Sequence, residues 1–283
     1  MSNKNKGIIL LLLSALGFSL MAAFVKLSGN VPTVQKTLFR NVVSMVIAFG
    51  FVMHHKERLF GKKENQKLLL LRSSLGAMGI VLFFYAIDHL VLSDAEMLNK
   101  MRPFLTIIFA GIFLKEHVRR FQMIAILVAF LGALFIIKPE FNLEIIPSLA
   151  GLLSAVFGAG AYTVLRALGN KEQFYTIVFY FSFFTTVILL PFVIVFYEPM
   201  TVQQWIYLLA AGVFATVGQF GITVAYKYAP PKEISIFFYS TVIYSAMISI
   251  FLFGQIPDVW SVLGYFTIFG ASLYMFFKSD DDH

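Results

Sequence analysis

The chain has 283 residues, of which 59% are hydrophobic and only 13% are charged. A soluble domain carries about 25% charged residues, so this composition is typical of a polytopic membrane protein. The sequence contains no cysteine, which excludes disulfides, thiolate catalysis and thiolate metal sites within it. The formal net charge of +7 could indicate nucleic acid binding, but the basic residues cluster between apolar segments, as they do in cytoplasmic loops.

Ten apolar segments are long enough to cross a membrane as helices of about 20 residues. In chain order the expected spans are 7–27, 33–53, 68–88, 93–115, 120–138, 147–168, 173–197, 202–226, 231–253 and 257–277. The first could be mistaken for a signal peptide, but its apolar run is too long, and we expect it to be retained. The sequence therefore predicts an all-α membrane protein with ten transmembrane helices.

Basic residues are distributed unevenly between the two sides of these spans. With the N-terminus inside, sixteen of the 22 Lys and Arg residues, Arg72 among them, fall on the inner side and three fall outside. The remaining three lie within spans and are Arg40, Lys100 and Arg102. Because Lys and Arg are enriched in cytoplasmic loops, we expect both termini to be cytoplasmic and the protein to lie in the cell membrane.

The two halves of the chain repeat weakly at an offset close to 140 residues. Ser14-Ala15 recurs as Ser154-Ala155, and Phe113-Leu114-Lys115-Glu116 aligns with Leu252-Phe253-Gly254-Gln255. Each half holds five spans, an odd number, so the second copy is inverted, as in secondary transporters with a site between their halves. We therefore expect residues 1–139 and 140–283 to form two inverted five-helix repeats around a central cavity.

Several short motifs carry a resemblance to a known family. They are Tyr85-Ala86, Ser93-Asp94-Ala95-Glu96, Leu114-Lys115-Glu116, Gly218-Gln219 and Gly254-Gln255-Ile256-Pro257. Over nearly its whole length the chain resembles the drug/metabolite transporter superfamily, specifically its ten-span EamA-type members, and each half resembles one EamA-type repeat. The family usually has a glutamate where Gln255 stands. The resemblance implies transport of a small metabolite by alternating access, without naming the cargo.

The fourth expected span carries charges that an apolar helix should not contain. Lys100 and Arg102 lie about two turns inside it, where a charge is costly unless it faces protein or water. Snorkelling to the interface is the alternative, but we expect at least one of the two to face a cavity and bind substrate. Asn99 could orient Arg102 or touch a ligand, and Arg40 adds a third candidate cation from the second span.

Two neighbours of these cations are candidates for gating or coupling. Glu96 lies on the helix face of Lys100, so the two could form a pair that is a strut or that breaks with substrate or proton. Its other role is in a capping box with Ser93. Pro103 removes a backbone hydrogen bond and could hinge the helix, although a kink for packing alone is the alternative.

The remaining candidates are polar residues elsewhere in the spans and at their ends. Glu116 and Gln255 occupy matching positions near the ends of the repeats, where they could act in gates; a solvated loop is the alternative for Glu116. Gln219 could bind substrate or join helices. Tyr162 and Tyr239 lie away from the expected interfaces, so their hydroxyls need partners and could bind substrate. We expect the 33 phenylalanines to be mostly lipid-facing and assign them no site.

These residues favour a carrier for a small polar metabolite, such as an amino acid or another carboxylate-bearing compound. The alternatives are a carrier for an organic cation held in an aromatic cage, and a membrane scaffold subunit that transports nothing. Motifs typical of metalloproteases, α/β-hydrolases and P-loop proteins do not occur in the sequence, so we expect no enzyme and no cofactor. The expected partners are the substrate and the lipid bilayer, with no nucleic acid. Proton coupling, uniport, a monomer and a homodimer all remain open.

Cysteine labelling tests the predicted topology on this chain. Cysteines introduced at Lys62 and Lys171 should not react with a membrane-impermeant reagent added to intact cells, because both positions are expected in the cytoplasm. A cysteine at Asn142, in an expected outer loop, should react. Labelling at Lys62 and Lys171 without labelling at Asn142 would contradict the topology.

Overall fold

The computed structural model describes residues 3–138, 145–228 and 234–280, and in these ranges every regular element is a helix. The first half contains α1 (Asn3–Leu27), α2 (Thr33–His54), η1 (Lys63–Asn65), α3 (Gln66–His89), α4 (Leu92–Asn99), α5 (Arg102–Phe113) and α6 (Arg120–Ile137). The second half contains α7 (Ile146–Leu168), η3 (Gly169–Lys171), α8 (Phe174–Val195), α9 (Val202–Tyr228), η4 (Ser235–Tyr239), α11 (Ser240–Phe253) and α12 (Val259–Asp280). The expected repeat boundary at 139 and 140, and Asn142, lie outside the described residues.

The expected fourth span is not one continuous helix. Nine helical segments in the described ranges are long and apolar enough to cross a membrane, and residues 93–115 are not among them. They are divided into α4 and α5, with a turn at Lys100 and Met101 between them. Pro103 explains the break, because it has no N–H to donate to the Asn99 carbonyl and so can only sit in the first turn of a new helix.

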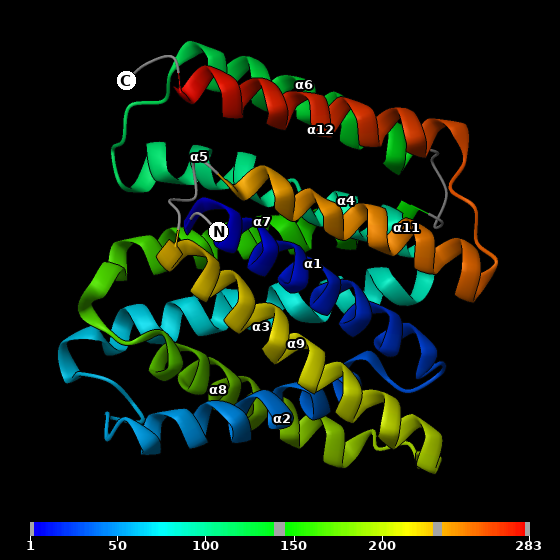
Figure 1. Ribbon diagram of the computed structural model, residues 1–283. Coiled ribbons are helices and arrows are strands. Elements are labelled where there is room, and N and C mark those ends of the chain that lie inside the picture. The colour runs from blue at the N-terminus through cyan, green and yellow to red at the C-terminus, as the bar shows by residue number, and fades with distance from the viewer. Residues whose placement is uncertain (1–2, 139–144, 229–233, 281–283) are drawn as a thin grey trace.

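The second half changes helix type at a corresponding place. The short 3₁₀ helix η4 ends at Tyr239, and α11 continues directly from Ser240. This junction contacts the break between α4 and α5, because the Tyr239 hydroxyl donates to the main-chain oxygen of Lys100 over 3.4 Å. Figure 1 shows α4 and α11 as neighbours, and these two helices pack directly against each other.

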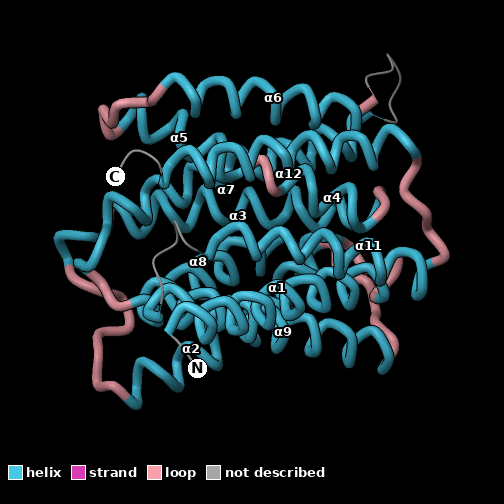
Figure 2. The backbone as a smooth tube through the Cα atoms, turned by 45° about the horizontal axis from the view of Figure 1, so that its top comes forward, coloured by secondary structure: helices cyan, strands magenta, loops and turns pink. Residues whose placement is uncertain are grey.

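The long helices pair across the two halves. α1 packs along α9, α3 along α7, α2 along α8, and α6 along α12. In Figure 1 the α6–α12 pair lies at the top of the molecule and the α2–α8 pair at the bottom, with both ends of the chain on the same side. Figure 2 shows that the helices run roughly along one direction and that the loops collect at the two ends. This arrangement suits a bundle whose helices all cross one layer.

Small residues let some of these pairs approach closely. A Cβ atom added to Gly264 in α12 would lie 2.7 Å from the carbonyl oxygen of Gly132 in α6, so the two backbones are in contact there. A Cβ atom on Gly17 in α1 would lie 3.0 Å from the amide nitrogen of Gly218 in α9. Such contacts are typical of membrane helices, which associate through close packing rather than through the hydrophobic effect.

The contact at Gly264 gives a prediction about stability. Gly264→Ala should lower the free energy of unfolding by about 1–3 kcal/mol, because the added methyl overlaps backbone that cannot move away. Gly270→Ala on the same helix is the matched control, since a Cβ atom there would meet nothing within 4 Å. Thermal melts of both purified variants provide the measurement, and equal melting temperatures would contradict the close α6–α12 contact.

Candidate substrate site

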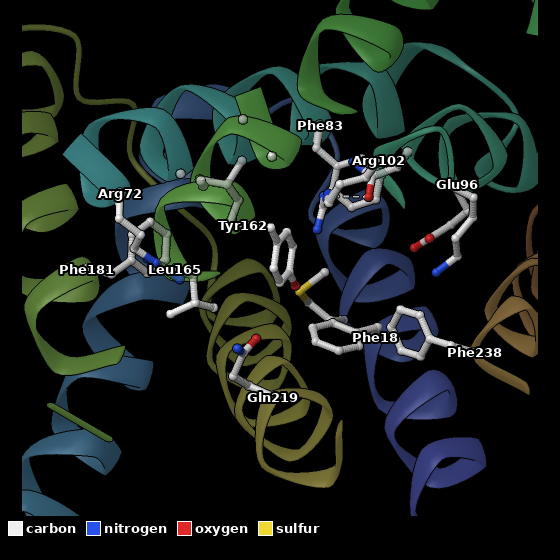
Figure 3. A pocket seen from close by; sticks show the side chains of 18 of the residues that line it. Phe18, Arg72, Phe83, Glu96, Arg102, Tyr162, Leu165, Phe181, Gln219 and Phe238 are labelled. Carbon is white, nitrogen blue, oxygen red and sulfur yellow. Dashed lines mark hydrogen bonds between the residues drawn. The ribbon is translucent and has the colours of Figure 1, made fainter. Parts of the chain in front are cut away.

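A cavity of about 160 Å³ lies among helices from both halves of the chain. Figure 3 shows Arg72 and Phe181 at one side of it, and Glu96 and Phe238 at the other. The lining residues are Phe18, Met21, Arg40, Arg72, Gly76, Gly79, Ile80, Phe83, Glu96, Asn99, Lys100, Arg102, Gly158, Ala161, Tyr162, Leu165, Phe181, Gln219 and Phe238.

The lining is strongly cationic. Four of the lining residues are basic, namely Arg40, Arg72, Lys100 and Arg102, whereas Glu96 is the single acid among them. In the part of the chain that the structure describes, no cluster of His, Asp and Glu could hold a metal ion. Buried positive charge that the protein itself does not neutralise favours an anionic ligand.

Lys100 lies in the turn between α4 and α5 and is only 6% exposed. Its ammonium group donates to the Thr241 hydroxyl over 3.0 Å and lies 3.8 Å from the centre of the Phe238 ring. Glu96 is also buried and lines the same cavity, but no ion pair within 4 Å joins it to Lys100 in the described residues. The pair that the helical spacing suggested is therefore not closed, because Lys100 reaches across to the second half instead.

Arg102 is positioned by a chain of hydrogen bonds. Its guanidinium donates to the Asn99 side-chain oxygen over 2.6 Å, and the Asn99 amide donates to the Ser154 hydroxyl over 2.9 Å. The guanidinium also lies 5.3 Å from the centre of the Tyr162 ring. Its Nε has no hydrogen-bond partner among the described residues. Asn99 thus orients Arg102 while part of the guanidinium keeps its capacity for a ligand.

Two further arginines complete the cationic lining. Arg40 on α2 is 8% exposed and donates to the Asn41 side chain over 3.0 Å. Arg72 on α3 lies 4.2 Å from the centre of the Phe181 ring. Arg72 was not a predicted site residue, because its place near the start of a span put it with the cytoplasmic cations. The helix begins at Gln66, so Arg72 lies more than a full turn inside it. That depth is the feature of the sequence that could have indicated a site residue.

The other predicted residues divide between the cavity and its surroundings. Gln219 and Tyr162 line the cavity, but Tyr239 does not: its ring packs edge-on against Phe269 and its hydroxyl bonds to the Lys100 backbone. Tyr239 therefore supports the cavity from behind. Pro103 also lies outside the lining, in the first turn of α5.

The two residues expected near gates lie in matching turns outside the cavity lining. The Glu116 amide donates to the Ala110 carbonyl over 3.3 Å, and the Gln255 amide donates to the Ser249 carbonyl over 2.8 Å. The residue before each has a left-handed backbone, at Lys115 (φ 55°) and Gly254 (φ 62°), as in the usual glycine-type end of a helix. The two turns have the same backbone design.

Four phenylalanines line the cavity, although nothing in the sequence assigned a site to any of them. They are Phe18, Phe83, Phe181 and Phe238. Many large apolar side chains on the long helices are exposed on the surface of the bundle, where they would face lipid. A phenylalanine in an apolar helix gives no sequence signal for the side it faces, because both lipid and packed protein accept it.

A substitution beside Arg102 tests the geometry of the cavity. In Gly158→Ala the new Cβ atom would lie 2.5 Å from Arg102 Nε, so the guanidinium must move away from Asn99 and Tyr162. We expect weaker binding of an anionic ligand with little change in the melting temperature of the free protein, because only the end of a flexible side chain has to shift. Gly160→Ala, whose Cβ would meet only the Leu75 side chain at 3.2 Å, is the control. Equal ligand affinity in both variants would contradict a role for Arg102.

Comparison with known proteins agrees with this architecture. The EamA-like transporter family matches the chain twice, over residues 5–138 and 145–277. The pseudopaline exporter CntI of Pseudomonas aeruginosa is 33% identical over 261 residues, which cover 91% of each chain. Solute carrier family 35 member G1 of Homo sapiens is 27% identical over 274 residues, covering 91% of this chain and 75% of the relative.

A solved crystal structure has the same fold, with a TM-score of 0.69 over 96% of each chain at 14% identity. The family expected from the sequence motifs is therefore confirmed. The chain belongs to the EamA-like transporter family, and it is a multi-pass membrane protein.

Proposed function

We propose that the protein is a secondary transporter that moves a small polar metabolite bearing a carboxylate, such as an amino acid, across the cytoplasmic membrane by alternating access. The observation that carries this proposal is the cavity lined by four basic residues and one acid. Family membership supports transport rather than catalysis. The relatives named as pseudopaline exporters favour outward movement of the metabolite.

The electrostatics of the cavity favour a carboxylate as the recognised group. Lys100 is almost fully buried, and Arg102 keeps an unpartnered Nε beside the same space. Arginine can hold a carboxylate through two parallel hydrogen bonds, and charge-assisted bonds of this kind are the stronger ones. A carboxylate that enters between these side chains would satisfy their unused donors and offset their charge.

The same contacts argue against an organic cation as the cargo. An aromatic cage needs open ring faces, but three of the rings that line the cavity already lie next to basic groups of the protein. These are Phe238 beside Lys100, Tyr162 beside Arg102 and Phe181 beside Arg72, at 3.8, 5.3 and 4.2 Å from ring centre to cation. A cationic cargo would have to displace these groups and would be repelled by them.

Two inverted repeats, residues 1–139 and 140–283, are the architecture that we propose for this transport. The double match to the family supports it. So does the pairing of helices, because the third helix of each half packs along the first helix of the other, as α3 does on α7 and α9 on α1. Transporters built in this way place their substrate between the repeats, where rocking of one repeat exposes it to either side.

Polar contacts between the halves at each end could open in turn. At one end Gln35 exchanges hydrogen bonds of 2.9 and 3.1 Å with the backbone of Glu198. At the other end the Glu172 side chain accepts hydrogen bonds of 2.7 Å from the Lys62 amide and from Asn65. Water can replace such contacts at little cost, which suits gates that open in alternation.

The proposal places both termini in the cytoplasm and leaves two energy sources for uphill transport. Both ends of the chain lie on one side of the bundle in Figure 1, and the charge distribution favours the cytoplasmic side. The sequence contains no P-loop motif, so uphill movement would depend on an ion gradient or on exchange. Glu96, buried in the cavity wall, is the candidate for proton coupling.

Substitution of the two central cations tests the proposed substrate class. A screen of metabolites for thermal stabilisation of the purified protein supplies a ligand, since binding at about a hundred times the dissociation constant adds about 2.7 kcal/mol. Lys100→Ala or Arg102→Ala should then weaken carboxylate binding by about 2–5 kcal/mol, because a buried charged partner is lost. Arg102→Lys should also weaken it if two parallel hydrogen bonds are used.

Arg120→Ala is the matched control, because Arg120 is exposed at the start of α6 and does not line the cavity. It should bind the ligand as the unmodified protein does. Tighter binding in both cavity variants would reject the carboxylate and favour a cationic cargo instead, because removing positive charge would then relieve repulsion.

A further inference from the structure

A second, smaller chamber of about 30 Å³ shares part of its wall with the main cavity. Arg40, Arg72, Phe181 and Gln219 line both spaces, whereas Lys100, Arg102 and Glu96 line only the larger one. The remaining polar lining of the chamber consists of the hydroxyl groups of Ser44, Ser182 and Thr216. No acid lines the chamber in the described residues, so its two guanidinium groups have no counter-charge in its wall.

Several hydrogen-bond donors in this chamber are unused. Arg40 Nε, Arg72 Nε and Nη1, and the Ser182 hydroxyl have no partner among the described residues. Arg40 is 8% exposed and Ser182 is fully buried, so these groups are also removed from bulk solvent. Buried donors without partners, and above all buried charges without partners, are strongly unfavourable. The donors point to an acceptor that is not part of the protein.

We propose that this chamber is a second anion site, which binds a carboxylate or a small inorganic anion while Lys100 and Arg102 bind the first carboxylate. The inference rests on the proposed function and narrows its substrate class. The transported compound either carries two carboxylates or carries one and travels with a free anion that occupies the chamber.

Size and charge both fit this assignment. A water molecule needs about 10–15 Å³ of such space, so the chamber accommodates one small ion or the oxygens of one carboxylate, but no whole metabolite. An amino acid zwitterion brings no net charge, so it cannot offset the excess of basic over acidic groups in the shared lining. Figure 3 shows Arg72, which also lines the smaller chamber, at the side of the cavity opposite Glu96.

Matched pairs of ligands test the inference on the purified full-length protein in chloride-free buffer. The probes are succinate, glutarate and adipate, each compared with its monoamide, in which a neutral group of similar size replaces one carboxylate. We expect at least one dicarboxylate to bind roughly tenfold or more tightly than its monoamide, because hydrogen bonds to a charged group contribute about this much to binding. In Arg72→Gln this preference should disappear, so that each dicarboxylate binds no more tightly than its own monoamide.

Arg120→Gln is the control for loss of a positive charge and should keep the preference. A chloride titration identifies the source of the anion. If chloride tightens monoamide binding in the unmodified protein and not in Arg72→Gln, a free anion occupies the chamber. If neither a dicarboxylate preference nor a chloride effect depends on Arg72, the second site does not exist.

The first site has its own readout, so the two ideas can fail separately. If Arg102→Gln loses binding of every carboxylate while Arg72→Gln keeps the full preference for dicarboxylates over monoamides, the second site is overturned and the proposed function stands. Equal binding of every carboxylate by the unmodified protein, Lys100→Gln and Arg102→Gln would overturn the proposed function itself.

A second variant covers the case in which Arg72→Gln does not fold. Ser182→Asp places a carboxylate inside the chamber, where it would occupy the site permanently and pair with the two arginines. We expect a higher melting temperature without ligand and no remaining preference for dicarboxylates. A melting temperature that falls, together with a preference that is retained, would overturn the assignment.

Discussion

The burial of positive charge inside an apolar bundle is the constraint on which the rest of this structure depends. A basic side chain in the middle of a membrane helix costs about 2.5–3.5 kcal/mol on insertion scales, and it remains there only when it faces protein or water. Arg40, Lys100 and Arg102 meet this condition by facing one cavity, and each has at least one polar contact within the protein. Close helix contacts elsewhere, as at Gly132 and Gly264, form the bundle that encloses this space.

The break between α4 and α5 leaves backbone groups that also need partners inside the membrane. Backbone that leaves the helical pattern at membrane depth must be buried in protein, because lipid offers no hydrogen bonds. Every residue of α4 is buried, and the Lys100 carbonyl at its end accepts a hydrogen bond from Tyr239 at the end of η4. The Lys100 amide still donates to the Glu96 and Met97 carbonyls, as in a helix, while its side chain donates to Thr241 of the second half.

The lengths of the apolar runs predicted most of the helices well, because such a run is a local property of the sequence. The same criterion does not reveal a break within a run. The division of residues 93–115 into two helices was therefore missed, although Pro103 marked its place. Charges inside spans pointed to the cavity, since Arg40, Lys100 and Arg102 have few other places to go. Arg72 escaped because the ends of spans carry basic residues for topology as well. Tyr239 lies outside the lining because the face that a hydroxyl presents depends on packing between distant helices, which no local pattern records.

The ion pair between the buried Lys36 of α2 and the partly buried Asp88 of α3, at 2.6 Å, has a consequence for synthesis of the chain. An 18-residue stretch of α2 has a mean hydropathy of 1.4, against 2.6 for a stretch of the same length in α1, and α2 carries Lys36 and Arg40 as well. Such a helix enters lipid less readily by itself than α1 does. Its ionic partner arrives only when α3 has been made, and its packing partner α8 only when the chain has been translated beyond Val195 in the second half. We therefore expect α2 to reach its final position in the membrane only after α3 and α8 have both been made.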